Sequence, residues 1–186
     1  LFRSLIGLYS GVVNGNTAAA ANAYSSAMFY VVTYVLTTLA VFGIIMLLAR
    51  EGFESEEITD FAGLNQRSPL YAGVMALCMF SLAGIPPMVG FAGKLSVLQA
   101  LIASGQTGAV ALAIYAVMMS LLAAFYYLRV VKVMYFDTPI TASTVSAGVD
   151  VRVVLLVNSG LLLVLGLLPG GLMTLCARAI VSTLGT

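Results

Sequence analysis

The sequence predicts an all-α, polytopic transmembrane helical bundle in which one helix is discontinuous, and three observations lead to this prediction. Of the 186 residues, 61% are hydrophobic and only 8% are charged, whereas soluble domains carry about 25% charged residues. The charges are clustered, so long uncharged stretches separate them. One of these stretches contains a run of prolines and glycines. Most of the surface must therefore face lipid or other apolar protein.

Uncharged stretches long enough to cross a membrane lie between the charges. A helix needs about 20 apolar residues to cross the hydrocarbon layer of about 30 Å. Four stretches exceed this length, and they are residues 4–49, 68–93, 95–128 and 153–177. No carboxylate falls inside any of them.

The first stretch is divided by a turn signal, Asn14-Gly15-Asn16-Thr17. We expect residues 1–13 to be the end of a truncated helix and residues 23–49 to be a full span. The chain has no initiator Met and no basic region that would mark a signal peptide. We therefore expect residues 1–186 to be a single transmembrane domain fragment, the C-terminal part of a longer protein.

The later elements follow from the same pattern of charges and breaker residues. Acidic side chains and glycines indicate a hydrated loop after the first span, and Thr, Ser and Gly indicate another further on. Pro169 and the two glycines after it end the last span. In order, we expect a loop at 50–67, a span at 108–136, a loop at 137–150, a span at 151–168 and a possible interfacial helix at 172–184.

The segment 68–104 fits neither one continuous helix nor a hairpin. As one helix it would extend about 55 Å, nearly twice the hydrocarbon thickness, and as a hairpin it lacks several residues. One broken span fits both limits, because non-helical backbone at membrane depth is tolerated inside protein or beside water. The residues expected to form the break are Gly84, Pro86, Pro87, Gly90 and Gly93. A proline kink without function is the alternative.

The distribution of basic residues favours the single broken span. With one crossing at 68–104, five basic residues share one face of the membrane and only Arg178 lies on the other; a hairpin splits them nearly evenly. The five are Arg50, Arg67, Arg129, Lys132 and Arg152. The positive-inside rule then places loops 50–67 and 137–150 in the cytoplasm and the C-terminus in the periplasm.

Lys94 is the one charge expected near the middle of the membrane. It lies about ten residues, or roughly 15 Å of helix, from the turn at Ser104-Gly105. An ammonium at that depth costs from about 2.5 to more than 10 kcal/mol, so it must face an interior or a hydrated path. A lysine can release its proton there, which makes Lys94 a candidate proton relay. Snorkelling to an interface, or a static pair with a carboxylate from elsewhere, are the alternatives.

A polar stripe precedes this segment, on the span 23–49. Its members recur at helical spacing on one face, and they are Tyr30, Thr33, Tyr34, Thr37 and Thr38. Thr33, Tyr34, Thr37 and Thr38 could line a water path beside Lys94. Alternatively, the threonines bond to carbonyls of their own helix or pack against a neighbour.

Several kinds of chemistry are excluded within this chain. Cys78 and Cys176 lie in apolar runs and there is no His, so a zinc site, an iron–sulfur cluster or a Cys/His nucleophile is not expected. There is no P-loop and no dinucleotide-binding glycine motif. A net charge of +1 without a basic patch gives no reason to expect nucleic acid as a partner. We expect no cofactor and no metal in this chain.

Two runs carry a resemblance to a known family. Residues 79–94, which include Gly84-Ile85-Pro86-Pro87 and end at Lys94, strongly resemble the antiporter-like subunits of respiratory complex I. Residues 124–136, which contain Tyr-Tyr-Leu-Arg-Val-Val-Lys, look most like the subunit N family of bacterial NADH-quinone oxidoreductase, as does the stretch 48–54.

The resemblance implies a fourteen-helix protein whose twelfth helix is discontinuous and carries a lysine of the central proton-conducting axis, a role that would fall to Lys94. It implies a proton-translocating membrane-arm subunit, part of an NADH:quinone oxidoreductase in the bacterial inner membrane. FMN, iron–sulfur clusters and quinone would be bound by other subunits. The expected partners are other membrane-arm subunits, including neighbouring antiporter-like ones, and the lipid bilayer. The alternative is a subunit of a cation/proton antiporter without a redox partner.

Overall fold

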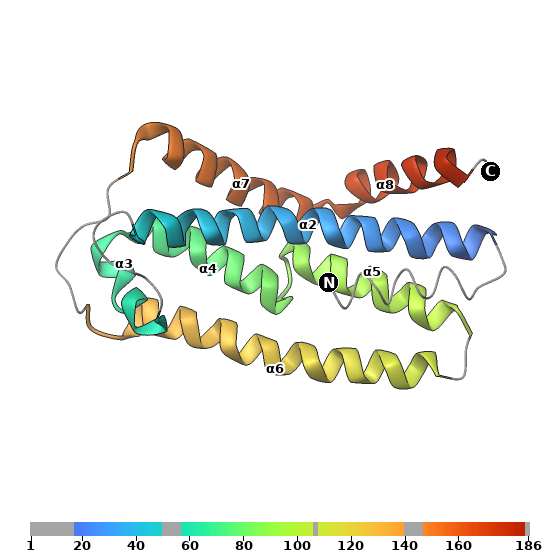
Figure 1. The fold of residues 1–186 in the computed structure, drawn as a ribbon, viewed down its shortest axis with the longest axis horizontal. Helices are drawn as coiled ribbons and strands as arrows, with labels where there is room; N and C mark the ends of the chain where they lie inside the picture. Colours follow the sequence, from blue (N-terminus) through green and yellow to red (C-terminus); the bar gives the residue numbers. More distant parts are fainter. Residues whose placement is uncertain (1–16, 50–56, 106–107, 140–146, 185–186) are drawn as a thin grey trace.

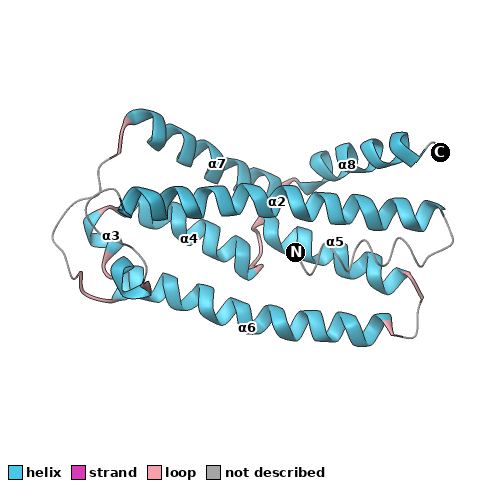
Figure 2. Ribbon diagram, viewed as in Figure 1, coloured by secondary structure: helices cyan, strands magenta, loops and turns pink. Residues whose placement is uncertain are grey.

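The computed structural model describes residues 17–49, 57–105, 108–139 and 147–184. These residues form helices joined by loops and turns, with no strand among them (Figure 2). The prediction of an all-α transmembrane bundle is therefore confirmed. The truncated helix expected at 1–13 and much of the two predicted loops lie outside the described residues.

Three helices are long and apolar enough to cross a membrane, judged by length and composition. They are α2 (Thr17–Ala49), α6 (Ala109–Phe136) and α7 (Val149–Leu167). With 33 residues, α2 extends about 50 Å. It ends where the expected span 23–49 ends, but it begins six residues earlier, at Thr17. The shorter helix α8 (Pro169–Leu184), which is not one of these three, follows α7 after a break at Leu168 and packs against α2.

The fourth crossing is made of two half-helices, α4 (Pro69–Ala83) and α5 (Val89–Ala103), which lie end to end along α2 (Figure 1). Each has 15 residues, or about 22 Å of helix, which is too short to span the membrane alone. The prediction of one discontinuous helix is thus confirmed, and its non-helical part is short.

Short elements close one end of the bundle. The 3-10 helix η1 (Ile58–Phe61) and α3 (Leu64–Arg67) both pack against α6. Between them, the amide of Gly63 donates a hydrogen bond to the carbonyl oxygen of Val133. Figure 1 shows that the C-terminal end of α6 and the start of α7 lie at this same end.

The central helix is α2, which packs against α4, α5, α7 and α8. Phe29 and Ile44 of α2 and Leu162 of α7 are completely buried in these contacts. By contrast, the main contacts of α6 among the described elements are with α4, α5 and the short elements, and it leaves many large apolar side chains exposed. Such a surface faces lipid or other apolar protein.

Candidate functional site

The break between α4 and α5 is enforced by its own residues. Gly84 ends α4 with φ of 83°, a left-handed conformation that glycine adopts without strain. Pro86 and Pro87 follow and supply no backbone amide, so the helix cannot continue through them. A helix end leaves carbonyl groups without intrahelical partners. In the middle of a membrane those groups need partners from within the protein.

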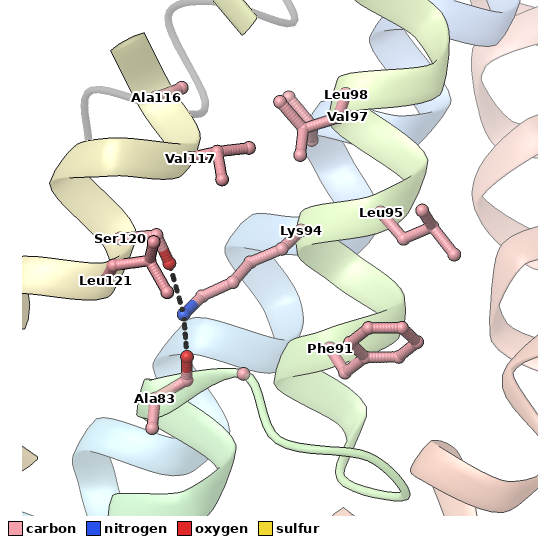
Figure 3. A pocket seen from close by; sticks show the side chains of 11 residues that line it. Ala83, Phe91, Lys94, Leu95, Val97, Leu98, Ala116, Val117, Ser120 and Leu121 are labelled. Carbon is pink, nitrogen blue, oxygen red and sulfur yellow. Dashed lines mark hydrogen bonds between the residues drawn. The ribbon is translucent and has the colours of Figure 1, made fainter. Parts of the chain in front are cut away.

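Lys94 supplies partners for these carbonyl groups. It lies on α5, and its side chain extends back toward the end of α4 (Figure 3). Its Nζ donates hydrogen bonds to the carbonyl oxygens of Leu82 and Ala83, each at 2.6 Å, and to Ser120 Oγ on α6 at 3.2 Å. A cation at a helix C-terminus also meets the negative end of the helix dipole. The break and the charge therefore stabilise each other.

Three glycines make room for this arrangement. A Cβ on Gly84 would lie 2.7 Å from both Cδ and Nζ of Lys94. On Gly90 it would overlap the carbonyl oxygen of Ser81, so only glycine lets α5 begin this close to α4. On Gly93 it would lie 3.3 Å from Thr33 Oγ1, where α5 approaches α2. The sequence-predicted break residues thus set how closely the three helices pack around Lys94.

Lys94 lines two pockets, one shared with α6 and one shared with α2. The first, which we name the α6-side pocket, has a volume of about 290 Å³ and lies between α5 and α6 (Figure 3). Lys94 and Ser120 line it together with mostly apolar side chains. The second, the α2-side pocket, has a volume of about 20 Å³, which is room for about one water molecule. It is lined by Tyr30, Thr33, Tyr34, Thr37, Ser81, Leu82, Gly90 and Lys94.

The polar stripe is divided by the structure. Thr33 and Thr37 are each only 2% exposed and line the α2-side pocket. Tyr34 lines it too, although it is 43% exposed. Thr38 lines neither of the two pockets, and its hydroxyl donates to carbonyl oxygens of its own helix. The Thr33 and Thr37 hydroxyls donate to carbonyls of their own helix as well.

Two serines that the sequence analysis did not name belong to the site. Ser81 on α4 is buried; its Oγ accepts a hydrogen bond from the Gly90 amide at 3.2 Å and lies 3.4 Å from Thr37 Oγ1. Ser120 contacts Lys94 as described above. One signal could have indicated it, because Ser120 is the only Ser, Thr, Asn or Gln in the stretch 108–128.

The last long helix also contacts the break. A Cβ on Gly166 of α7 would overlap the carbonyl oxygen of Pro87. Nearer the start of α7, Asn158 Nδ2 donates a hydrogen bond of 2.8 Å to the Leu36 carbonyl oxygen of α2. Thus α7 is bound to α2 through Asn158 and packs closely against the non-helical segment at Pro87 through Gly166.

Metal-binding groups are not found at this site. Among the described residues, no three His, Cys, Asp or Glu side chains lie close enough to hold a metal ion. Cys78 and Cys176 are free and buried. None of the described carboxylates lines either pocket beside Lys94.

Comparison with known proteins assigns the chain to a family of membrane proteins. A family model described as NADH:quinone oxidoreductase/Mrp antiporter, transmembrane, matches residues 9–122. NADH-quinone oxidoreductase subunit N of Polaromonas naphthalenivorans is 66% identical over 95% of this chain, and that of Herminiimonas arsenicoxydans is 59% identical over 98%. The chain spans 36% of the length of each of these two relatives.

Solved structures share the fold. Respiratory complex I from Thermus thermophilus matches 92% of this chain and 43% of its own, with a TM-score of 0.68 and 23% identity. The Mrp complex from Dietzia sp. DQ12-45-1b matches 96% of this chain and 45% of its own, with a TM-score of 0.72 and 20% identity.

Proposed function

Because the chain belongs to the NADH:quinone oxidoreductase/Mrp antiporter transmembrane family, we propose that it forms part of a proton-translocating membrane-arm subunit of a bacterial NADH-quinone oxidoreductase. The two relatives at 66% and 59% identity carry the name subunit N of this enzyme. In this proposal the chain contributes to a translocase but holds no redox centre. FMN, iron–sulfur clusters and quinone belong to other subunits, and the partners are other membrane-arm subunits and the bilayer.

The observation that carries the proposal is the position of Lys94. Its ammonium binds two carbonyl oxygens that a break in a membrane-crossing helix has released. An intramembrane cation is costly to maintain, so such a residue marks an ion or proton pathway more often than a purely structural contact. Lysine can exchange its proton where arginine cannot. Lys94 is therefore the proton relay of this proposal.

The pathway follows from the two pockets that Lys94 borders. Protons would move through water molecules, with Thr33, Tyr34 and Thr37 lining the path on the α2 side. Quinone reduction elsewhere in the enzyme would change the electrostatic field along the membrane arm and so the protonation of Lys94. A proton would then be released to the periplasmic side. Thr38 could contribute only if the path extends beyond the α2-side pocket.

The proposed orientation places loops 50–67 and 137–150 in the cytoplasm and the C-terminus in the periplasm of a cell with an inner membrane. Figure 1 supports it, since the segments that carry four basic residues gather at one end of the bundle. The four basic residues are Arg67, Arg129, Lys132 and Arg152. The helix that carries Arg178, α8, lies toward the other end (Figure 1). Labelling of single cysteines introduced at Asp137 and Thr183 by a membrane-impermeant thiol reagent tests this orientation.

The relay role is tested by replacing Lys94 with Met in the full-length subunit of the assembled enzyme. We expect proton pumping into vesicles to be lost, and Lys94→Arg to impair it as well. Lys132→Met is the matched control, because that lysine is 69% exposed and its ion-pair oxygen on Asp137 is 3.9 Å away. Undiminished pumping by Lys94→Met would overturn the proposal.

A second candidate function is a subunit of a cation/proton antiporter that acts without a redox partner. The family description includes Mrp antiporters, and the fold matches an Mrp complex with a TM-score of 0.72. Purification of the full-length subunit from its host decides between the two. Flavin- and iron–sulfur-containing subunits accompany it in the first case and are missing in the second.

A further inference from the structure

The Ser120 hydroxyl lies 3.2 Å from the Lys94 ammonium and borders the α6-side pocket. We infer that Ser120 is the group through which Lys94 passes its proton, so the relay is directed toward α6. This inference rests on the proposed relay role of Lys94. It adds a named partner and a direction to that role.

Three hydrogen-bond partners of Lys94 Nζ, namely Leu82, Ala83 and Ser120, differ in chemistry. The carbonyl oxygens of Leu82 and Ala83 can only accept, whereas the Ser120 hydroxyl can both accept and donate. A charged ammonium has three N–H groups, and these three partners can accept from them. A neutral amine has two N–H groups and one lone pair. The two carbonyls can retain the N–H groups, and of these three partners only Ser120 can donate to the lone pair. Both protonation states of Lys94 are therefore satisfied in one geometry.

The threonine hydroxyls on the α2 side are less suited to this exchange. The Thr33 and Thr37 hydroxyls donate their hydrogens to carbonyl oxygens of α2. Ser81 Oγ accepts from the Gly90 amide and lies beside Thr37 Oγ1. Among the described residues, in contrast, the Ser120 hydroxyl accepts from Lys94 and donates to no other group. Its hydrogen is free to turn toward Lys94 or toward the α6-side pocket.

Small side chains on α6 bring Ser120 to Lys94. Ala109, Ala113 and Ala116 are buried where α6 meets α5. They lie 11, 7 and 4 positions before Ser120, which places all four on one face of the helix. Because alanines allow close approach between helices, this face brings the Ser120 oxygen within hydrogen-bonding distance of Nζ. Ser120 follows these alanines on the same face and lines the α6-side pocket.

The proton transfer is balanced as follows. One N–H bond of the Lys94 ammonium breaks, and its proton passes to Ser120 Oγ. At the same time the hydroxyl releases its own proton to a water molecule in the α6-side pocket, which becomes hydronium. Lys94 is left as a neutral amine, and the hydrogen of the reformed hydroxyl, which came from Lys94, already points at the lone pair of that amine. Reprotonation of Lys94 completes the cycle.

The experiment compares Ser120→Thr with Ser120→Val in the full-length subunit of the assembled enzyme. The two side chains have nearly the same shape, and only Thr retains a hydroxyl. The α6-side pocket of about 290 Å³ accommodates the additional methyl group. A positioned general acid–base group raises the rate of a proton-transfer step by about 100-fold or more. A water molecule in place of the lost hydroxyl can restore part of that rate. We therefore expect Ser120→Val and Ser120→Ala to lower the proton-pumping rate by about tenfold, and Ser120→Thr to stay within about twofold of the parent.

Ser159→Ala is the control for loss of a buried hydroxyl, since Ser159 is on α7, lines neither pocket and bonds only within its helix. Rates are compared per assembled enzyme. Equal proton-pumping rates for Ser120→Thr and Ser120→Val overturn the inference. If Lys94→Met loses pumping in the same assay, the proposed function stands although the inference fails. If Lys94→Met pumps normally, the proposed function and this inference both fail.

Discussion

Replacement of Gly84 by Ala tests whether the end of α4 holds Lys94 in its working position. Gly84 has φ of 83°, and a Cβ there would lie 2.7 Å from Lys94 Nζ. Carbon and nitrogen atoms normally remain about 3.5 Å apart, so the ammonium must move by about 0.8 Å. This movement lengthens at least one of the two hydrogen bonds from Nζ to the Leu82 and Ala83 carbonyl oxygens, now 2.6 Å each, beyond the usual hydrogen-bond distance.

The expected effect of Gly84→Ala has two parts that can be separated. The left-handed backbone costs an alanine about 1–2 kcal/mol, which lowers thermal stability. The displacement of the relay acts on proton transfer, where an error of about 1 Å can cost about 100-fold. We expect the proton-pumping rate in vesicles to fall by at least about tenfold, by that reasoning.

Gly105→Ala is the matched control for the backbone strain. Gly105 has φ of 66°, but no atom of the described residues other than its chain neighbours lies within 4 Å of the position a Cβ would take. We expect it to lower the temperature of thermal inactivation in the same way and to leave pumping nearly unchanged. Equal pumping by Gly84→Ala and Gly105→Ala would refute the reasoning that the clearance at Gly84 is kept for Lys94.

Two further predictions concern how closely the helices pack around the break. Gly90→Ala introduces a Cβ that overlaps a backbone carbonyl of α4, so we expect little assembled subunit in membranes by immunoblot. Gly73→Ala, with no atom within 4 Å, should assemble normally. Gly166→Ala on α7 would push against the Pro87 carbonyl and displace the break, so we expect lower pumping per assembled enzyme. Gly160→Ala on the same helix meets nothing within 4 Å; equal pumping by the two α7 variants would contradict this support role.

Much of the architecture could be predicted from the positions of charges, prolines and glycines. Charged groups are costly in lipid, so uncharged stretches mark the spans. Prolines and glycines cannot sustain helical hydrogen bonding, so they mark the break. The same physics singled out Lys94, because it follows the break inside an otherwise uncharged region. These signals are local and need no knowledge of how the helices pack.

The partners of Lys94 could not be predicted in the same way. Its ammonium reaches back across the break to Leu82 and Ala83, which depends on the path of the non-helical segment. Ser120 is on another helix, and hydrophobic periodicity does not indicate which face of α6 packs inward, because lipid-facing and buried residues are both apolar. The stripe on α2 shows a similar limit. A helical face is wide enough that Thr37 is 2% exposed while Tyr34, three residues earlier, is 43% exposed.

The most direct test of the central claim is the number of protons pumped per NADH oxidised by the Lys94→Met enzyme in vesicles. The control is Lys132→Met, which removes an exposed cation from α6. If Lys94 is the relay, the ratio falls for Lys94→Met and stays at the parent value for Lys132→Met. An unchanged ratio and rate in Lys94→Met, with the variant subunit present in the assembled enzyme, would contradict the account.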